Sequence, residues 1–88
     1  MKDMFNKCHN LISLNLNNFN TSKVQDMGWM FYDCYSLIDL NINKFDTTSV
    51  TNMEGMFDGC NNLTILNLNN FYTPNVINMK VCSIIVFL

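Results

Sequence analysis

Residues 27–52 read MGWMFYDCYSLIDLNINKFDTTSVTN, and this stretch decides the fold because its pattern recurs on both sides of it. Units 1–26 and 53–78 repeat it without an insertion, and eleven of the 26 columns (positions 26 residues apart) are identical in all three units. Nine of these columns hold Met, Phe, Cys, Leu, Thr or Val, and two hold Asn. A fixed period of about 20–50 residues is typical of stacked repeats. The sequence therefore predicts a repeat domain over residues 1–80, followed by an off-pattern apolar tail at 81–88.

The apolar spacing changes character along each unit. The first part of unit two has apolar residues at i, i+3, i+4 and i+7, which predicts a short helix with one buried face. That set is Met27, Met30, Phe31 and Cys34. Further on, Leu40 and Ile42 alternate with polar residues, as in a strand with one buried face. Thr51 and Asn52 are both placed where they could cap the next helix. One such unit cannot bury its apolar face alone, so the units are expected to stack, with their strands in a parallel sheet.

The fixed residues of the unit resemble a known family. The pattern M-x-x-M-F-x-x-C-x-x-L-x-x-L-x-L-x-x-F-x-T-x-x-V is similar to the repeat of the BspA-like leucine-rich-repeat surface proteins, and it covers nearly the whole chain. The resemblance implies an α/β fold class: a leucine-rich-repeat-like solenoid of three 26-residue units, each with a short strand and a short helix. It also implies a cell-surface or extracellular location and a role in adhesion. Cys82 and Ser83 depart from the pattern, where Met and Phe are expected.

Composition and charge exclude several classes of function. The formal net charge is −2 and there is no cluster of Lys or Arg, which argues against a nucleic-acid partner. The apolar tail is shorter than the roughly 20 residues that a membrane-spanning helix needs, so this chain is not expected to insert into a membrane. Met1 already belongs to the repeat, so no secretory signal is expected within the chain.

Residues able to carry chemistry are few and scattered. Three of the four cysteines share the column Cys8/Cys34/Cys60, and a straight ladder of thiols is not a tetrahedral zinc site. They are predicted to be buried free thiols that pack as small apolar side chains. His9 is the only histidine and has no repeated serine or acidic partner. We therefore expect no enzyme activity, no catalytic residue, no metal and no cofactor.

Two surfaces are candidates for ligand binding. The first is the outward face of the strands, where the two invariant Asn columns are also predicted to hydrogen-bond from unit to unit. Its candidates are Asn15, Asn17, Asp39, Asn41, Asn43, Asn67 and Asn69. The second is a group of aromatic residues that only unit two carries, and aromatic side chains of this kind are typical recognition anchors. Its candidates are Trp29, Tyr32 and Tyr35. These aromatics could equally cover the edge of the helix layer.

The sequence favours a binding repeat module over other roles. The predicted function is non-catalytic adhesion to a protein or glycan through the exposed strand face. The alternative is a structural spacer, or a truncated repeat fragment, with no ligand of its own. A third possibility is end-to-end self-association, because the end of a stack exposes strand edges and apolar columns.

Overall fold

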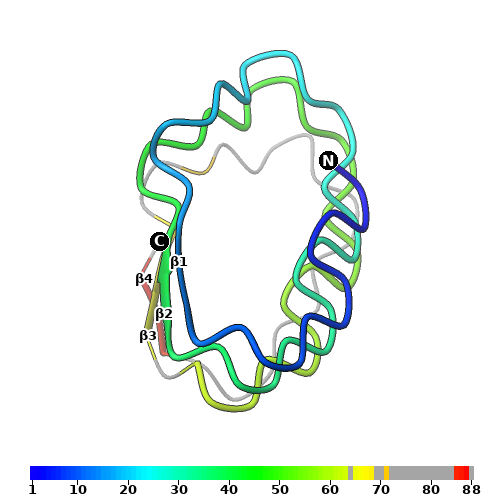
Figure 1. Ribbon diagram of the computed structural model, residues 1–88. Coiled ribbons are helices and arrows are strands. Elements are labelled where there is room, and N and C mark those ends of the chain that lie inside the picture. Colours follow the sequence, from blue (N-terminus) through cyan, green and yellow to red (C-terminus); the bar gives the residue numbers. More distant parts are fainter. Residues whose placement is uncertain (64, 69–70, 72–84, 88) are drawn as a thin grey trace.

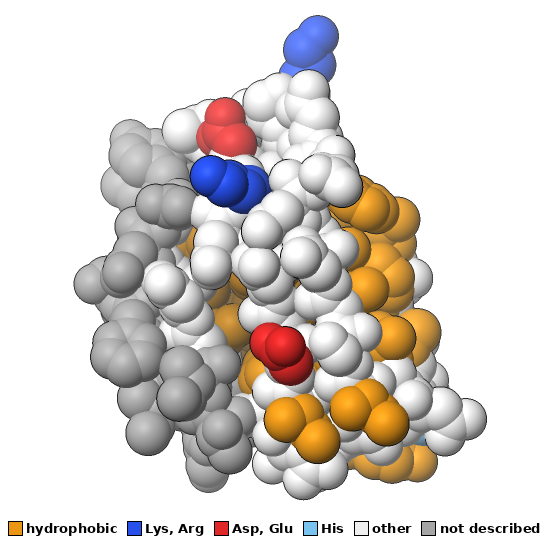
Figure 2. All heavy atoms as spheres, turned by 60° about the vertical axis from the view of Figure 1, so that its left-hand side comes forward, with side chains coloured by type: hydrophobic (Ala, Val, Ile, Leu, Met, Phe, Trp, Pro, Cys, Tyr) orange, Lys and Arg blue, Asp and Glu red, His pale blue; other side chains and the backbone are white. Residues whose placement is uncertain are grey.

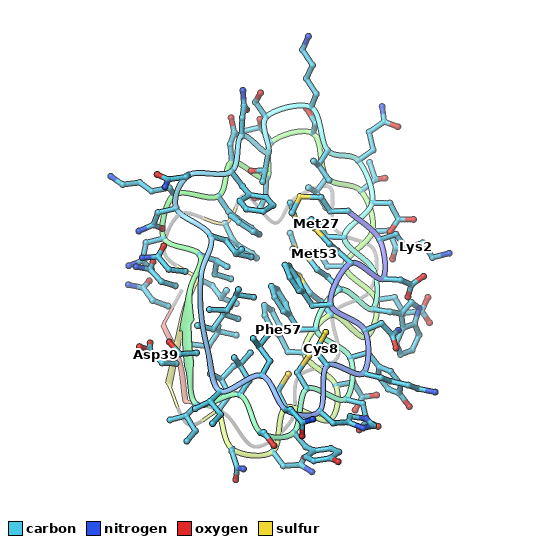
Figure 3. The ribbon with its side chains drawn as sticks, viewed as in Figure 1. Lys2, Cys8, Met27, Asp39, Met53 and Phe57 are labelled. Atoms are coloured by element: carbon cyan, nitrogen blue, oxygen red, sulfur yellow. The ribbon has the colours of Figure 1, made fainter. Side chains whose placement is uncertain are left out.

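The chain closes into an oval circuit, and successive circuits lie one over the next (Figure 1). The computed structural model describes residues 1–63, 65–68, 71 and 85–87. Short strands lie along one side of the oval and a run of tight turns lies along the other. Met27, Met53 and Phe57 point into the interior, whereas Lys2 and Asp39 point out into solvent (Figure 3). The invariant apolar columns are therefore the inward positions.

Each strand is three residues long. The strands are β1 (Ser13–Asn15), β2 (Asp39–Asn41), β3 (Ile65–Asn67) and β4 (Ile85–Phe87). β1 and β2 pair in parallel with Leu14 opposite Leu40, so the 26-residue period sets their register. β3 pairs in parallel with β4, with Ile65 opposite Ile85, a separation of 20 residues rather than 26. Part of the tail that departs from the repeat thus adds a strand beside unit three, as its β-branched residues favour.

The predicted fold class, an α/β leucine-rich-repeat-like solenoid with a helix in every unit, is wrong. The part of the chain that the structure describes contains no helix, and its strands form two separate two-stranded sheets rather than one sheet through all units. Outside the strands, each circuit consists of tight turns and irregular segments.

Backbone hydrogen bonding explains why the predicted helix over 27–34 does not form. In a helix the amides beyond the first turn bond within the segment. Here alternate amides, those of Trp29, Phe31 and Asp33, donate instead to carbonyls of unit three at 2.7–2.9 Å. The amides between them close turns three residues back, such as Cys34 N–H to the Phe31 carbonyl at 3.2 Å. Consecutive turns of this kind also bring every third or fourth side chain inward, so the apolar spacing alone did not separate them from a helix.

Left-handed residues at fixed columns make these turns possible. Asp3, Trp29 and Gly55 share one column and have φ values of 61°, 57° and 64°. The next such column, four residues on, has φ values between 59° and 83° and consists of Lys7, Asp33 and Gly59. A positive φ at the third residue is what a type II turn requires. A left-handed residue at two places would break a helix, and here it turns alternate amides toward the next circuit.

The core is a set of ladders made by the invariant columns. The rings of Phe5 and Phe31 stack with centroids 5.7 Å apart, and Phe31 stacks on Phe57 at the same distance. The thiols take part as well: Cys34 Sγ donates to the Phe5 carbonyl at 3.0 Å, and Cys60 Sγ donates to the Phe31 carbonyl at 3.1 Å. The cysteine column therefore links neighbouring circuits by hydrogen bonds, which a purely apolar side chain could not do.

Polar side chains in two columns also connect neighbouring circuits by hydrogen bonds. Thr21 is buried, and its hydroxyl both donates to the Asp46 carbonyl at 3.0 Å and accepts the Asp46 N–H at 2.8 Å. The predicted capping residue Asn52 does cap the backbone, because its Oδ1 accepts the Glu54 N–H at 2.9 Å, but it caps a turn rather than a helix. Its Nδ2 also donates to Asp26 Oδ1 at 3.1 Å in the circuit before. Thr21 and Asn52 thus each bond from one circuit to the next.

Candidate binding surface

The strands present a mostly polar outward face. Ser13, Asn15 and Asp39 are exposed there, and Asn41 is half-buried beside them. Asn67 of β3 is also exposed. Three-residue strands with apolar Leu14 and Leu40 between polar neighbours produce this face by simple alternation. The structure therefore brings most of the predicted strand-face candidates together, and Asn69 lies outside the described residues.

Hydrogen bonds hold the asparagines of this face in place. The Oδ1 atom of Asn15 accepts the N–H of Asn17 at 3.0 Å, and Asn41 Oδ1 accepts the N–H of Asn43 at 3.1 Å. These are Asx turns, which end each strand by replacing a ladder bond with a side-chain bond. We expected the column to bond from unit to unit, whereas these oxygens bond within their own unit. The consequence is a row of amides that is already oriented.

Apolar side chains adjoin the polar face, and the sequence analysis did not select them. Ile12 and Ile38 are each 59% exposed, and the Ile38 N–H donates to the Ile12 carbonyl at 2.8 Å, so the two lie in adjacent circuits. Figure 2, which turns the strand side toward the reader, shows hydrophobic side chains among the polar ones on this face. A signal was available in the sequence, because each isoleucine directly follows an inward leucine and directly precedes a strand. The two isoleucines therefore place a small apolar patch beside the polar row, and apolar surface of this kind can take part in a contact.

The aromatic residues of unit two lie on the other side, among the turns, where Trp29 and Tyr32 are partly exposed and Tyr35 is exposed. Trp29 is only partly exposed and meets Tyr32 edge-on, with ring centroids 5.2 Å apart. A Cβ built on Gly55 would fall 2.1 Å from two carbons of the indole, so the Trp29 ring occupies the space that this glycine leaves. Tyr35 is 42% exposed and stacks on His9 at 4.5 Å. These contacts match the alternative in which the aromatics cover an edge of the structure.

The His9 imidazole lies beside the Asp33 carboxylate. Nε2 of His9 lies 3.7 Å from Asp33 Oδ2, which is too far for a hydrogen bond, and this nitrogen is buried without a hydrogen-bond partner in that part of the chain. Asn17 Oδ1 is in the same situation. No group of three or more His, Cys, Asp or Glu side chains able to hold a metal ion occurs within the described ranges.

The pKa values of Cys34 and Asp46 are shifted from their ordinary values. Burial raises the pKa of the Cys34 thiol, which keeps it protonated at neutral pH. The hydroxyl and the N–H of Thr48 both donate to the Asp46 carboxylate, at 2.7 and 3.0 Å, and these bonds lower the pKa of Asp46. The Asp46 shift reflects the turn that residues 46–48 form, and the Cys34 shift reflects burial of the thiol in the core. Neither side chain lies on the strand face.

The cysteine column predicts an order of chemical reactivity. Cys8 is half-buried, whereas Cys34 and Cys60 are fully buried, and only thiolate reacts with an alkylating reagent. With iodoacetamide at pH 8, we expect Cys8 to be alkylated at least about ten times faster than Cys34. Peptide mass mapping against time measures this, with the urea-unfolded chain as the control in which the three rates converge. Equal rates in the folded chain would contradict the burial of Cys34.

Among the described residues, no helix is long and apolar enough to cross a membrane.

Comparison with known proteins identifies a family and no individual relative. No curated protein and no solved structure matches the chain. Residues 1–82, nearly the whole chain, match the family described as "Mycoplasma protein of unknown function, DUF285", and the chain belongs to that family.

Proposed function

We propose that the chain is a non-catalytic binding module of a cell-surface or secreted protein, and that it holds its ligand through the strand face. One observation carries the proposal. A row of asparagines, held in place by its own hydrogen bonds, lies on the same side of the molecule as two exposed isoleucines. A surface of this kind costs little conformational entropy when it binds, because the amides do not have to be ordered first.

The make-up of the face favours a protein ligand over a glycan. Ile12 and Ile38 would bury aliphatic surface, while Asp39 and the asparagines would supply hydrogen bonds around it. Apolar contact surrounded by polar groups is the usual anatomy of a protein interface. The aromatic rings that stack on sugars lie elsewhere: Trp29 is packed against Gly55, and Tyr35 against His9.

The surface location rests on resemblance. The columns beginning M-x-x-M-F-x-x-C are similar to those of the BspA-like surface proteins, some of which are implicated in adhesion. The family to which the chain belongs has no assigned activity and adds none to this proposal.

The test is binding of the folded chain to a panel of purified extracellular proteins and to a printed glycan array. We expect saturable binding to a protein, weakened about tenfold or more by Asp39→Arg, which places a large cation on the exposed face. Asn41→Arg should act in the same way but also removes the bond to Asn43, so its thermal stability is measured in parallel. The matched control is Asn61→Arg, an exposed position among the turns on the other side.

Each outcome separates the candidates. Binding that Asn61→Arg weakens and Asp39→Arg does not would move the site to the turn side. Saturable binding to glycans alone would contradict a protein ligand. A folded chain with no saturable ligand in either screen would favour the alternative, a structural spacer.

A further inference from the structure

We propose that the turn side of units two and three is a binding surface for a basic polypeptide segment, recognised through its Lys or Arg side chains. We call this surface the aromatic turn face. Its rings are those of Trp29, Tyr32 and Tyr35, and its carboxylates are those of Asp33, Glu54 and Asp58. It lies across the oval from the strands (Figure 1), so the inference does not depend on the strand-face ligand.

The three rings occupy columns in which the repeat does not require an aromatic residue. In the other units the column of Trp29 holds aspartate and glycine, that of Tyr32 asparagine and aspartate, and that of Tyr35 histidine and asparagine. The inward residue between them, Phe31, is fully buried, whereas Tyr35 is 42% exposed and the other two rings are partly exposed. Unit two therefore adds aromatic surface to the outside of the stack, beyond what its core uses.

Two glycines of unit three hold this surface in place. A Cβ on Gly55 would fall 2.1 Å from the Trp29 ring, and a Cβ on Gly59 would fall 2.6 Å from Asp33 Oδ1. The indole and the carboxylate are thus each packed on a backbone position that has no side chain. The Trp29 ring also meets the Tyr32 ring edge-on, with centroids 5.2 Å apart. Groups that are already ordered lose little conformational entropy when they bind a partner.

The charge around the rings selects the kind of partner. The turn segments of units two and three, residues 27–36 and 53–62, contain no Lys or Arg, and their charged residues are Asp33, Glu54 and Asp58. Among the described residues, no lysine forms an ion pair with Asp33 or Glu54. The rings therefore lie in a region of negative charge that the chain does not neutralise with its own lysines.

A basic segment matches both the rings and the carboxylates. A cation placed over the face of a Trp or Tyr ring is attracted by the ring, and Arg does this more often than Lys. The guanidinium group also bonds carboxylates, so one side chain can use both kinds of group. A nucleic acid or an anionic membrane would be repelled by the same carboxylates. A neutral glycan could stack on the rings, but its binding would depend little on salt.

The experiment titrates the folded chain with an oligo-arginine peptide, and an oligo-glutamate peptide of the same length is the control. Trp29 is the only tryptophan, so a change in its emission reports contact at this face. We expect a saturable change with oligo-arginine and none with oligo-glutamate. Because the attraction is partly between exposed charges, the affinity should fall about tenfold or more when NaCl is raised from about 50 to about 500 mM.

Two pairs of variants locate the site. Glu54→Gln and Asp39→Asn each remove one exposed carboxylate, the first on the aromatic turn face and the second on the strand face. Tyr35→Ala and Ile38→Ala each remove one large exposed side chain on the same two sides. We expect Glu54→Gln to weaken peptide binding about threefold and Tyr35→Ala about tenfold, with no change for Asp39→Asn or Ile38→Ala. Thermal unfolding of each variant shows whether the fold is intact.

The outcomes that would overturn the proposal are distinct. Equal weakening by Asp39→Asn and Glu54→Gln would mean that the peptide responds to the net charge of −2 and not to this face. Weakening by Asp39→Asn and Ile38→Ala alone would place the peptide on the strand face. Binding that leaves the Trp29 emission unchanged, or that does not depend on salt, would also contradict the proposal. So would a folded chain that shows no saturable binding of oligo-arginine.

Discussion

Replacing Phe31 by alanine is expected to lower the free energy of unfolding by about 3–5 kcal/mol, the usual cost of removing a buried phenylalanine. The Phe31 ring is fully buried and stacks on two others, with centroids 5.7 Å away on either side. Its loss leaves a cavity in the middle of the ladder, between circuits whose backbones are fixed by hydrogen bonds and cannot close the gap. Urea unfolding followed by circular dichroism measures the change.

The matched control for this prediction is Phe5→Ala in the same column. Phe5 stacks on one described ring only and is half-buried, so the same substitution should cost about half as much. An equal loss for both variants would mean that the ladder does not contribute through stacking on both sides of Phe31.

Replacing Gly55 by alanine is expected to destabilise the fold by about 2–4 kcal/mol, from a clash and from backbone strain together. The new Cβ would lie 2.1 Å from the Trp29 ring, and the residue has a φ of +64°. Trp29 is the only tryptophan, so its fluorescence should also shift to the red as the ring is displaced into solvent. Urea unfolding gives the energy and the emission spectrum gives the displacement.

A double variant separates the two causes. Trp29→Ala with Gly55→Ala removes the ring that the Cβ would hit, so the pair should be less damaging than the sum of the single changes. The remaining cost is the left-handed backbone, which Asp3 and Trp29 tolerate with a Cβ in the same column. Strict additivity of the two substitutions would contradict the packing of Trp29 over Gly55.

The repeated columns of the sequence predict which residues point inward, but they do not predict the backbone conformation between those residues. The fixed columns identified the inward residues correctly: Met27, Phe31, Leu37 and Val50 are all fully buried. The strand positions around Leu40 and Leu66 were also identified. The helix was wrong because a period of three to four residues is shared by helices and by consecutive turns. Gly55 and Gly59, four residues apart inside the predicted helix of unit three, were the available warning, because each glycine in a helix interior costs about 1 kcal/mol.

Part of the candidate binding surface could be predicted from the sequence, and part of it could not. Alternation along a strand places Ser13, Asn15 and Asp39 outward, so the strand face followed from the sequence. The role of Trp29 did not, since nothing in residues 27–34 says that the ring lies over a glycine 26 residues later. The exposure of Ile12 and Ile38 was not predicted, because the fixed columns mark the inward residues and do not rank the variable residues beside them.

The sequence by itself determined the period, the inward columns and the parallel register of β1 with β2, because identical units can bury identical apolar faces only by lying over one another in phase. The tertiary structure alone decided the path of the backbone between the inward residues. The amides of Trp29, Phe31 and Asp33 could bond within their own segment, as in a helix, but in the structure they bond to the next circuit. The apolar pattern of the sequence is compatible with both arrangements. Contact with the neighbouring circuit, which supplies carbonyls and ring surface at once, selects the turns. It also fixes which side chains remain exposed at the first unit.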